Sequence, residues 1–330
     1  MLLLSRADIL SVFSMRDAIE SDKKAFVRHT QGKATAPLRI NIETDDKAGQ
    51  LMFMPAYVGG DIGVAGVKIV SSFPGNAGKG LPVVPALVAA ICCDTGIVKA
   101  ILEGTTLTQM RTAAIAGVAT ELLSNEDSRI GALFGTGGQA PAQLEALLTV
   151  RRLAEVRVFD AVPGKAESFA NNNHSLAWHF GSKLVPVNSA EEAAYDADII
   201  TTVTTSGSPV FSADGVKPGC HINGIGSFTP DKRELSAEIL GRASKIYVDS
   251  REAVMAEAGD FIIPICEGLF REDKITGELG ELILGQTPGR EDKNEITVMK
   301  TVGFATLDVV TAADIVASAV RSGVGTNVEM

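Results

Sequence analysis

Apolar residues in the first 120 positions switch between helical spacing and strand-like alternation. In the helical segments they recur three or four residues apart, and a glycine follows the first of these segments. In the strand-like segments β-branched and aromatic residues stand between turn-forming residues. The pattern predicts helices over residues 15–32 and 107–124 and strands over residues 49–58 and 62–76.

From residue 130 the chain alternates regularly between short apolar runs and helical segments. The runs predict strands over residues 130–134, 156–160, 183–187, 198–203, 220–226 and 245–249. The segments between them predict helices over residues 141–153, 164–173, 190–197 and 232–242. Strands joined by helices pair in parallel, so we expect a doubly wound sheet. The pattern blurs after residue 249, and residues 299–320 again look helical.

Composition and charge narrow the class of protein. The 330 residues are enough for two domains, or for one domain with a large insertion. They are 45% hydrophobic and 21% charged, which is ordinary for a soluble α/β protein. A net charge of −10 argues against nucleic-acid binding. The longest apolar stretch, residues 81–93, is too short for a membrane span, and the N-terminus lacks the features of a secretory signal. The four cysteines lack CxxC spacing and the histidines lack metal-ligand spacing, so we expect a cytoplasmic protein without a metal.

A glycine-rich loop follows the first strand of the alternating region. Gly135, Gly137 and Ala140 form G-x-G-x-x-A between a strand and a helix, and Asp160 ends the next strand. Backbone N–H groups of such a loop hold a pyrophosphate, and the acid takes a ribose hydroxyl. The alternative is a purely structural turn. A carboxylate repels a 2′-phosphate, so the sequence favours NAD(H) over NADP(H), although Lys165 lies nearby in sequence.

Three cations of the first segment stand beside turn or strand signals: Arg39, Lys68 and Arg111. Strand alternation puts Lys68 on the face opposite its two apolar neighbours, where an ammonium needs a partner or a ligand. Arginine suits bidentate carboxylate capture, and lysine suits a point-charge contact or proton transfer. The alternative is that each cation pairs with a nearby acid such as Glu43, Asp61 or Glu103.

At this point the chain resembles the ornithine cyclodeaminase/mu-crystallin family. The matching phrases occur in the family's order across nearly the whole chain: GVKIVSSFPGN, GLP, LEGTTLTQMRTAAIAGVAT, GTGGQA, GSFTPDKREL and EITVMKTVG. Together they are a much stronger signal than the glycine loop alone.

The resemblance implies an α/β fold in which a Rossmann-type doubly wound parallel sheet is inserted in a discontinuous α+β domain. Residues 121–304 would form the NAD(P)-binding domain. Residues 1–120 and 305–330 would form the substrate-binding and dimerisation domain of a homodimer.

The resemblance also assigns roles to individual positions. Substrate-carboxylate contacts would come from Arg39, Lys68 and Arg111. Cofactor contacts would come from Arg111, Thr112, Gly135, Gly137, Gly138, Gln139, Asp160, Thr202, Val203, Thr204, Ser227, Lys232 and Thr301.

One position departs from the family pattern. Where the cyclodeaminases and archaeal alanine dehydrogenases of the family carry a catalytic aspartate, this chain has Phe228, which cannot transfer protons. The nearby acid is Asp231, which is either a catalytic candidate or the N-cap of the helix expected near Lys232.

Three functions remain open. The first is NAD(P)H-dependent reduction of a C=N bond beside a carboxylate, reversible as an amino-acid dehydrogenation, with Lys68 stabilising or protonating the imine nitrogen. The second is an ornithine cyclodeaminase that uses NAD+ catalytically, which Phe228 disfavours. The third is a non-catalytic binder like mu-crystallin, which the retained cations disfavour. The sequence leaves open which small imine or amino acid is the substrate and in which direction the reaction runs.

Overall fold

The computed structural model describes residues 1–44 and 48–329, which form two compact units. One unit comprises Met1–Arg111 and Phe304–Met330, and the other comprises Thr112–Gly303. The first unit ends at Arg111, whereas the sequence placed the boundary after residue 120. Both positions lie within the same helix, α3 (Gly104–Leu123). The roles of the two units in substrate and cofactor binding stay predictions.

The first unit is built on a mixed sheet in the order β16-β1-β7-β6-β5-β4-β2, with β3 also paired to β4. All the pairs except β1 with β7 are antiparallel. The strands are β1 (Leu2–Leu4), β2 (Ala34–Thr35), β3 (Ile40–Glu43), β4 (Gln50–Val58), β5 (Val64–Ser72), β6 (Ala86–Cys92), β7 (Val98–Glu103) and β16 (Thr326–Asn327). A 3-10 turn, η1 (Pro74–Lys79), follows β5.

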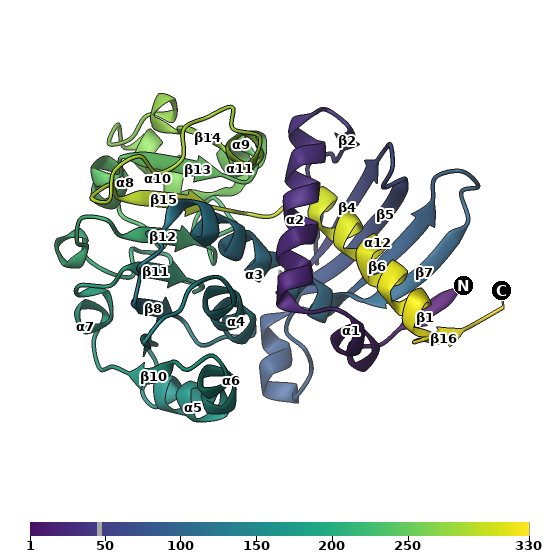
Figure 1. The fold of residues 1–330 in the computed structure, drawn as a ribbon, viewed down its shortest axis with the longest axis horizontal. Coiled ribbons are helices and arrows are strands. Elements are labelled where there is room, and N and C mark those ends of the chain that lie inside the picture. The colour runs from purple at the N-terminus through teal and green to yellow at the C-terminus, as the bar shows by residue number, and fades with distance from the viewer. Residues whose placement is uncertain (45–47, 330) are drawn as a thin grey trace. The chain divides into compact units, whose positions relative to one another are not determined.

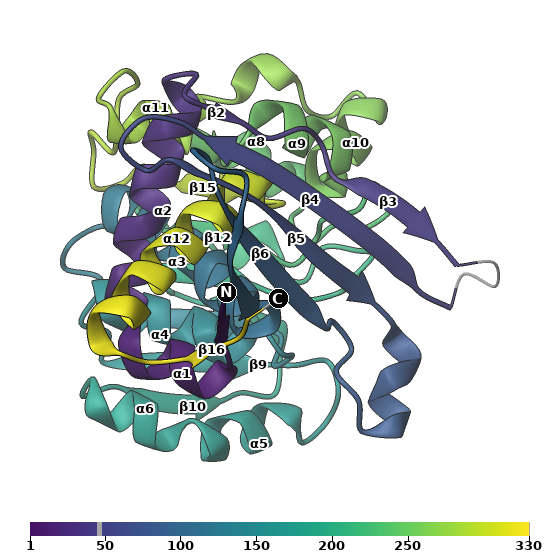
Figure 2. The same cartoon turned by 90° about the vertical axis from the view of Figure 1, so that its right-hand side faces the viewer.

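Helices cover one face of this sheet. Figure 1 shows α2 (Met15–Thr30) and α12 (Ala305–Ser322) packed along it, with α1 (Arg6–Val12) beside them. Ser14 and Asp17 form a capping box at the start of α2, and Gly32 follows its end with a φ of 67°, as its helical pattern predicts. Figure 2 shows the opposite face, which no described helix of this unit covers.

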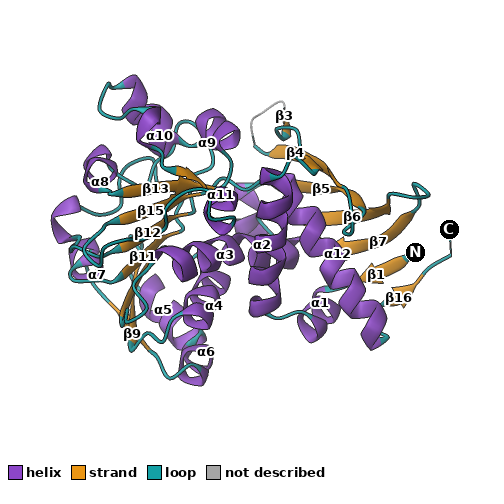
Figure 3. Ribbon diagram, turned by 45° about the horizontal axis from the view of Figure 1, so that its top comes forward, coloured by secondary structure: helices purple, strands orange, loops and turns teal. Residues whose placement is uncertain are grey.

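The second unit contains a parallel sheet in the order β10-β9-β8-β11-β12-β15-β13-β14. Figure 3 shows its central strands side by side. The strands are β8 (Ile130–Phe134), β9 (Glu155–Phe159), β10 (Lys183–Pro186), β11 (Ile199–Thr202), β12 (His221–Gly224), β13 (Lys245–Val248), β14 (Gly277–Glu278) and β15 (Thr297–Lys300). The order reverses between β8 and β11, which is the switch point where doubly wound sheets bind ligands. The predicted Rossmann-type sheet is confirmed.

Helices connect these strands: α4 (Ala140–Val150), α5 (Lys165–Asn172), α6 (His174–His179), α7 (Ala190–Ala194), α8 (Ala237–Arg242), α9 (Arg251–Glu257), α10 (Gly259–Cys266) and α11 (Leu279–Ile283). Two short 3-10 turns, η2 (Ala213–Gly215) and η3 (Glu272–Lys274), lie among them.

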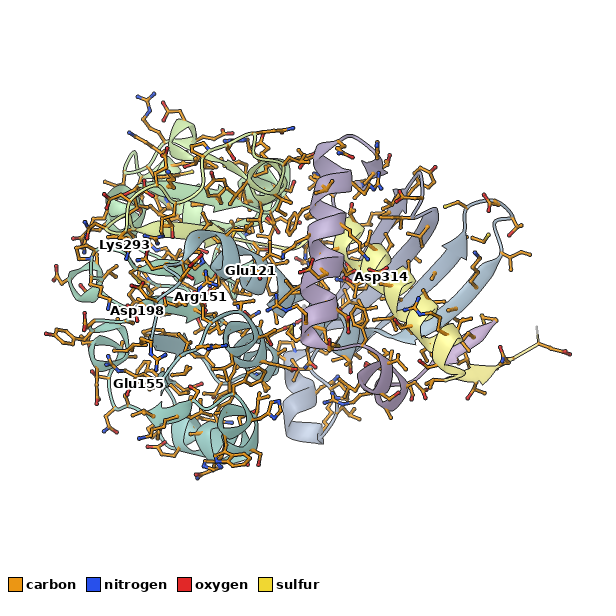
Figure 4. All side chains as sticks on the ribbon, viewed as in Figure 1. Glu121, Arg151, Glu155, Asp198, Lys293 and Asp314 are labelled. Atoms are coloured by element: carbon orange, nitrogen blue, oxygen red, sulfur yellow. The ribbon has the colours of Figure 1, made fainter. Side chains whose placement is uncertain are left out.

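Several helix boundaries differ from the prediction. The helix expected over residues 141–153 ends at Val150, and the backbone of Arg151 is already extended. The Arg151 guanidinium donates to carbonyl oxygens at the end of α3, among them that of Glu121 at 2.9 Å (Figure 4). The run from residue 299 is not helical at its start, since Met299 belongs to the buried strand β15. In the described part of the chain, no helix is long and apolar enough to cross a bilayer.

Candidate active site

A buried ion cluster joins three elements of the first unit. The Lys68 ammonium of β5 lies 2.9 Å from Oδ1 and 2.8 Å from Oδ2 of Asp308 on α12. The Nε of Arg111 on α3 donates to Oδ1 of the same carboxylate at 2.9 Å. Lys68 is 1% exposed, Arg111 5% and Asp308 0%. We call Lys68, Arg111 and Asp308 the cation cluster.

Local sequence explains how each member reaches the cluster. The alternation along β5 puts Lys68 on the face opposite Val67 and Ile69, as predicted, and the structure shows this to be the buried face, which Lys68 shares with Val64 and Val70. Asp308 lies in the first turn of α12, where the helix dipole favours a negative charge. Glu103 caps α3 by accepting from the N–H groups of its second and third residues, each at 2.8 Å, and so holds the start of the helix that carries Arg111.

Burial dominates the electrostatics of the cluster. Desolvation lowers the pKa of Lys68 to about 7, with a further decrease from Arg111 and an opposing increase from Asp308. Burial acts to raise the pKa of Asp308, but Arg111 and Lys68 together hold it below its ordinary value. The cluster therefore keeps a carboxylate ionised and leaves Lys68 able to exchange a proton near neutral pH.

Arg39 also acts on this cluster. It lies half-buried just before β3, and its positive charge contributes to lowering the pKa of Lys68. The structure thus brings two of the predicted cations, Arg39 and Arg111, within electrostatic range of the third, Lys68. Two of the three acids named as alternative partners are engaged elsewhere: Asp61 pairs with Arg28, and Glu103 caps α3.

Sequence reasoning missed Asp308. Its signal was a single acidic residue among apolar ones in a helical run, FATLDVV, and only the fold shows which cation it faces. It also missed Asp22 of α2, a fully buried carboxyl that interacts electrostatically with Arg111 and Asp308.

The glycine loop of the second unit connects β8 to α4 at the switch point of the sheet. Gly135 has a φ of 94°, and a Cβ there would stand 2.8 Å from the Val203 carbonyl oxygen, so only glycine fits. A Cβ on Gly137 would meet nothing within 4 Å. The N-cap of α4 is Gln139, whose side chain makes no capping hydrogen bond, while the Ala140 N–H donates to the Gly137 carbonyl at 3.0 Å and Pro141 has no N–H.

Asp160 closes this loop from the end of β9. One of its oxygens accepts from the Thr136 N–H at 3.0 Å and the Thr136 hydroxyl at 2.7 Å. The other accepts from the Val162 N–H at 2.9 Å. A carboxylate has about four acceptor positions, so Asp160 keeps capacity for a ribose hydroxyl.

A buried network sets the strand ends next to the glycine loop. The Glu234 carboxylate accepts from the N–H groups of Thr204 and Gly226, each at 2.6 Å, and of Ser227 at 3.2 Å. Burial raises the pKa of Glu234, with Lys300 opposing the increase. The Ser227 hydroxyl donates to the Lys232 carbonyl at 2.5 Å. Sequence reasoning missed Glu234, which holds Thr204 and Ser227 in place.

Other predicted cofactor positions lie at the carboxyl edge of the same sheet or near it. Thr202 ends β11 and is fully buried. Thr301 follows β15, and its hydroxyl donates to Asp249. Val203 follows β11, and the Lys232 carbonyl accepts from Ser227. Thr112 lies on α3, and Gly138 lies two residues before the start of α4.

The structure corrects one alternative for Asp231. No helix begins near Lys232, because the N–H groups of Glu234 and Leu235 donate to a buried Asp260 oxygen at 2.6 and 2.8 Å. Helix α8 starts only at Ala237 with Ser236 as its N-cap, so Asp231 is not a helix cap. It is exposed, and Thr229 lowers its pKa. Phe228 is 40% exposed and lies in the segment between β12 and α8.

Among the described residues no group of acids, cysteines and histidines has the arrangement of a metal site. The arrangement thus consists of a dinucleotide-type loop in one unit and a buried cation cluster in the other. The first fits a pyrophosphate and a ribose, and the second fits a small carboxylate and a proton transfer.

Comparisons with known proteins show the family to which the chain belongs. The model of the ornithine cyclodeaminase/mu-crystallin family matches residues 1–323. A Delta(1)-pyrroline-2-carboxylate reductase of Bacillus cereus is 34% identical over 329 residues, covering 100% of both chains.

Two solved structures share the fold over their whole length. The Delta(1)-pyrroline-2-carboxylate reductase of Thermococcus litoralis, in complex with NADH and L-proline, is 41% identical with a TM-score of 0.94, covering 99% of this chain and 100% of that one. An archaeal alanine dehydrogenase dimer with bound NAD is 34% identical with a TM-score of 0.92, covering 100% and 99%.

Proposed function

Because the chain belongs to the ornithine cyclodeaminase/mu-crystallin family, we propose that it reduces the C=N bond of a small imine that bears a carboxylate beside that bond. NADH supplies the hydride, which adds to the carbon, while a proton adds to the nitrogen. The observation that carries the proposal is the cation cluster, which offers a buried carboxylate-binding charge and a proton-exchanging lysine in one place. The reverse reaction is an amino-acid dehydrogenation.

Residues of the first unit would hold the substrate. Arg39 and Arg111 would bind its carboxylate, since guanidinium groups suit that geometry. Lys68 would sit beside the imine nitrogen and give it the proton. Asp308 contacts both the Lys68 ammonium and the Arg111 guanidinium and so fixes the positions of these two groups relative to each other. Asp308 is thus a positioning residue.

Residues of the second unit would hold the cofactor. The loop of Gly135, Gly137, Gly138 and Gln139 would take the pyrophosphate, because Gly137 leaves open space and the α4 N-terminus is uncapped by a side chain. Asp160 would take a ribose hydroxyl. NAD(H) is favoured over NADP(H), since Asp160 would repel a 2′-phosphate.

The names of the relatives narrow the substrate. Two of them are Delta(1)-pyrroline-2-carboxylate reductases, one with NADH and L-proline bound. We therefore place Δ1-pyrroline-2-carboxylate first, with proline as its product. Phe228, in the place of an acid, supports reduction over a lyase reaction from ornithine.

A homodimer is part of the proposal. Figure 2 shows the sheet face of the first unit that lies away from α2 and α12. By strand register and alternation this face carries apolar side chains, among them Ile40 and Tyr57, which are 56% and 49% exposed. A second copy of the chain would bury this face, and the archaeal alanine dehydrogenase relative is a dimer.

The four cysteines are free, which supports the expected reducing compartment.

The test is NADH oxidation with a panel of imines. The panel contains Δ1-pyrroline-2-carboxylate, Δ1-piperideine-2-carboxylate, and pyruvate, glyoxylate or oxaloacetate with ammonia or methylamine. We expect the five-membered cyclic imine to give the highest kcat/KM. Lys68→Met should lower its kcat by about 100-fold or more, whereas Lys24→Met, a partly exposed lysine on α2, should leave it unchanged.

Two outcomes would refute the proposal. Turnover of Lys68→Met at the unaltered rate on every accepted imine would remove Lys68 from the reaction. Formation of proline and ammonia from ornithine with catalytic NAD+ would establish the lyase instead.

A further inference from the structure

Asp22 occupies a core position of an amphipathic helix. It is 0% exposed and lies on the face of α2 that packs against α12. The other buried residues of this face are Met15, Ala18, Ile19, Ser21, Ala25 and Phe26. An apolar side chain would be the default there, because a buried carboxyl costs free energy unless it is paired.

The Asp22 carboxyl lacks the partners that a buried anion requires. Neither of its oxygens makes a hydrogen bond within the described part of the chain. The Thr311 hydroxyl of α12 stands near enough to favour its ionised form, and it lies 3.5 Å from the Ser21 hydroxyl. A carboxyl so placed is stable as a neutral acid and poorly stable as an anion.

Two charges of the cation cluster act on Asp22: Arg111 from α3, which attracts its anion, and Asp308 from α12, which repels it. Burial is the largest influence and, with Asp308, raises the pKa of Asp22 well above its ordinary value of 3.8.

The other charged groups of the packed elements are engaged elsewhere. On α2, Asp17 caps the helix, Glu20 pairs with Lys23, and Arg28 pairs with Asp61. Lys24 pairs with Asp314 of α12 at 3.0 Å on the exposed side of the helix pair (Figure 4). His29 packs against the Phe304 ring, Arg16 has a partner of its own, Arg321 of α12 bonds Ser318, and β2 carries no titratable side chain.

The protonation state of Asp22 changes the net charge that the buried cluster offers to a substrate carboxylate. Protonated Lys68 and Arg111 bring two positive charges into the buried cluster, and Asp308 brings one negative charge. Arg39, which also acts on Lys68, adds a third positive charge at the half-buried edge of the site. An ionised Asp22 would add a second buried negative charge that interacts with Arg111 and would so weaken the attraction of the site for a substrate carboxylate, whereas a neutral Asp22 leaves that attraction intact.

We propose that Asp22 is a positioning residue that controls how strongly the cation cluster attracts the substrate carboxylate. As a neutral acid, Asp22 leaves the positive charge of Lys68 and Arg111 to the substrate. As an anion, it neutralises part of that charge. The proposal rests on the proposed function for the identity of the substrate. Asp22 acts through Arg111 and the cluster and needs no contact with the substrate. Its ionisation competes with substrate binding, so the affinity for an anionic substrate falls as pH rises.

The consequence is a rise of KM at alkaline pH, which we call the alkaline limb. Above the pKa of Asp22, the KM of the unaltered enzyme for the imine rises by up to about tenfold per pH unit, since one proton is lost per binding site. In Asp22→Asn the side chain cannot ionise, so this limb disappears and KM stays lower at high pH. Titration of Lys68 is common to both proteins, and their difference isolates Asp22.

The experiment compares unaltered enzyme, Asp22→Asn and the control Asp314→Asn, whose side chain lies in the exposed pair of the same two helices. KM and kcat are measured from about pH 6 to about pH 10. The dissociation constant of pyrrole-2-carboxylate, a planar carboxylate without a reducible bond, is measured in parallel with NADH present. Infrared spectra with 13C-labelled aspartate follow the C=O band of a protonated buried carboxyl.

We expect the control to share the alkaline limb and Asp22→Asn to lose it in both KM and the dissociation constant. The infrared band should be present in the unaltered protein at neutral pH and absent in Asp22→Asn. Equal pH dependence in all three proteins, or an ionised Asp22 at neutral pH, would overturn the proposal. So would an equal loss of kcat at every pH with unchanged dependence of KM, which marks a purely structural role.

Two safeguards keep the test decisive. If Asp22→Asn does not fold, Asp22→Val and the infrared titration of the unaltered protein take its place. If no imine is reduced, the proposed function fails, whereas pyrrole-2-carboxylate binding and the infrared band still decide the role of Asp22.

Discussion

The Lys68 ammonium contacts both oxygens of Asp308, at 2.9 and 2.8 Å, although 240 residues separate the two in sequence. This contact makes the C-terminal helix α12 part of the candidate active site. It also means that the charge of Lys68 depends on a residue outside the phrases that carry most of the family resemblance.

Replacing Asp308 should damage both activity and stability. Asp308→Asn leaves Lys68 and Arg111 as buried cations without a carboxylate, and losing one partner of a buried pair costs about 3–5 kcal/mol of unfolding free energy. The pKa of Lys68 should fall further below about 7, because Asp308 is a group that raises it. Urea denaturation and the pH profile of kcat/KM check this, with Asp314→Asn as the control. An unshifted profile in a stable Asp308→Asn protein would contradict it.

The rates of imine reduction and of the reverse oxidation should depend on pH through Lys68. Below its pKa of about 7 the side chain is an ammonium that can give a proton to the imine, and above it the side chain is a free amine. We expect kcat/KM for imine reduction to fall as pH rises through about 7 and that for proline oxidation to rise. Bound substrate carboxylate favours the ammonium, so the limb in kcat should lie at higher pH. Profiles with the same limb in both directions would be inconsistent with this role.

Cofactor choice should depend on Asp160. Asp160→Ala removes the acceptor for a ribose hydroxyl and the charge that repels a 2′-phosphate. We expect KM for NADH to rise by about tenfold, equivalent to about 1.4 kcal/mol, with a smaller change for NADPH. Thr136→Val is the matched control, because it removes one hydrogen bond to Asp160 and keeps the carboxylate. Equal losses with NADH and NADPH in Asp160→Ala would show that Asp160 only anchors the loop.

Stability should reveal the raised pKa of Asp22. A carboxyl with a raised pKa binds more protons folded than unfolded, so its contribution weakens as pH rises from 3.8 toward the folded pKa. Asp22→Asn lacks this loss, and its stability relative to the unaltered protein should grow by about 1.4 kcal/mol per pH unit in that window. Thermal or urea unfolding at a series of pH values measures it. A constant difference would mean that Asp22 has an ordinary pKa.

Much of the fold could be predicted because its signals are local. Alternation along residues 64–72 is a property of neighbouring side chains, and it placed Lys68 on the face opposite Val67 and Ile69, which the structure shows to be the buried one. Strands separated by helices predict parallel pairing, and the conformation required of Gly135 allows only glycine. These features depend on residues a few positions apart, so the sequence by itself determined the sheet type, the glycine loop and the need of Lys68 for a partner.

The tertiary structure alone decided which partner that is. Asp308 and Asp22 lie on helices far apart in the chain, and nothing in their neighbourhoods shows which charge they will face. The start of α8 was predicted too early for the same reason, since Asp260 takes the N–H groups of Glu234 and Leu235. Buried charges pair with whatever the fold brings within a few ångströms, and that proximity is a property of the packed chain.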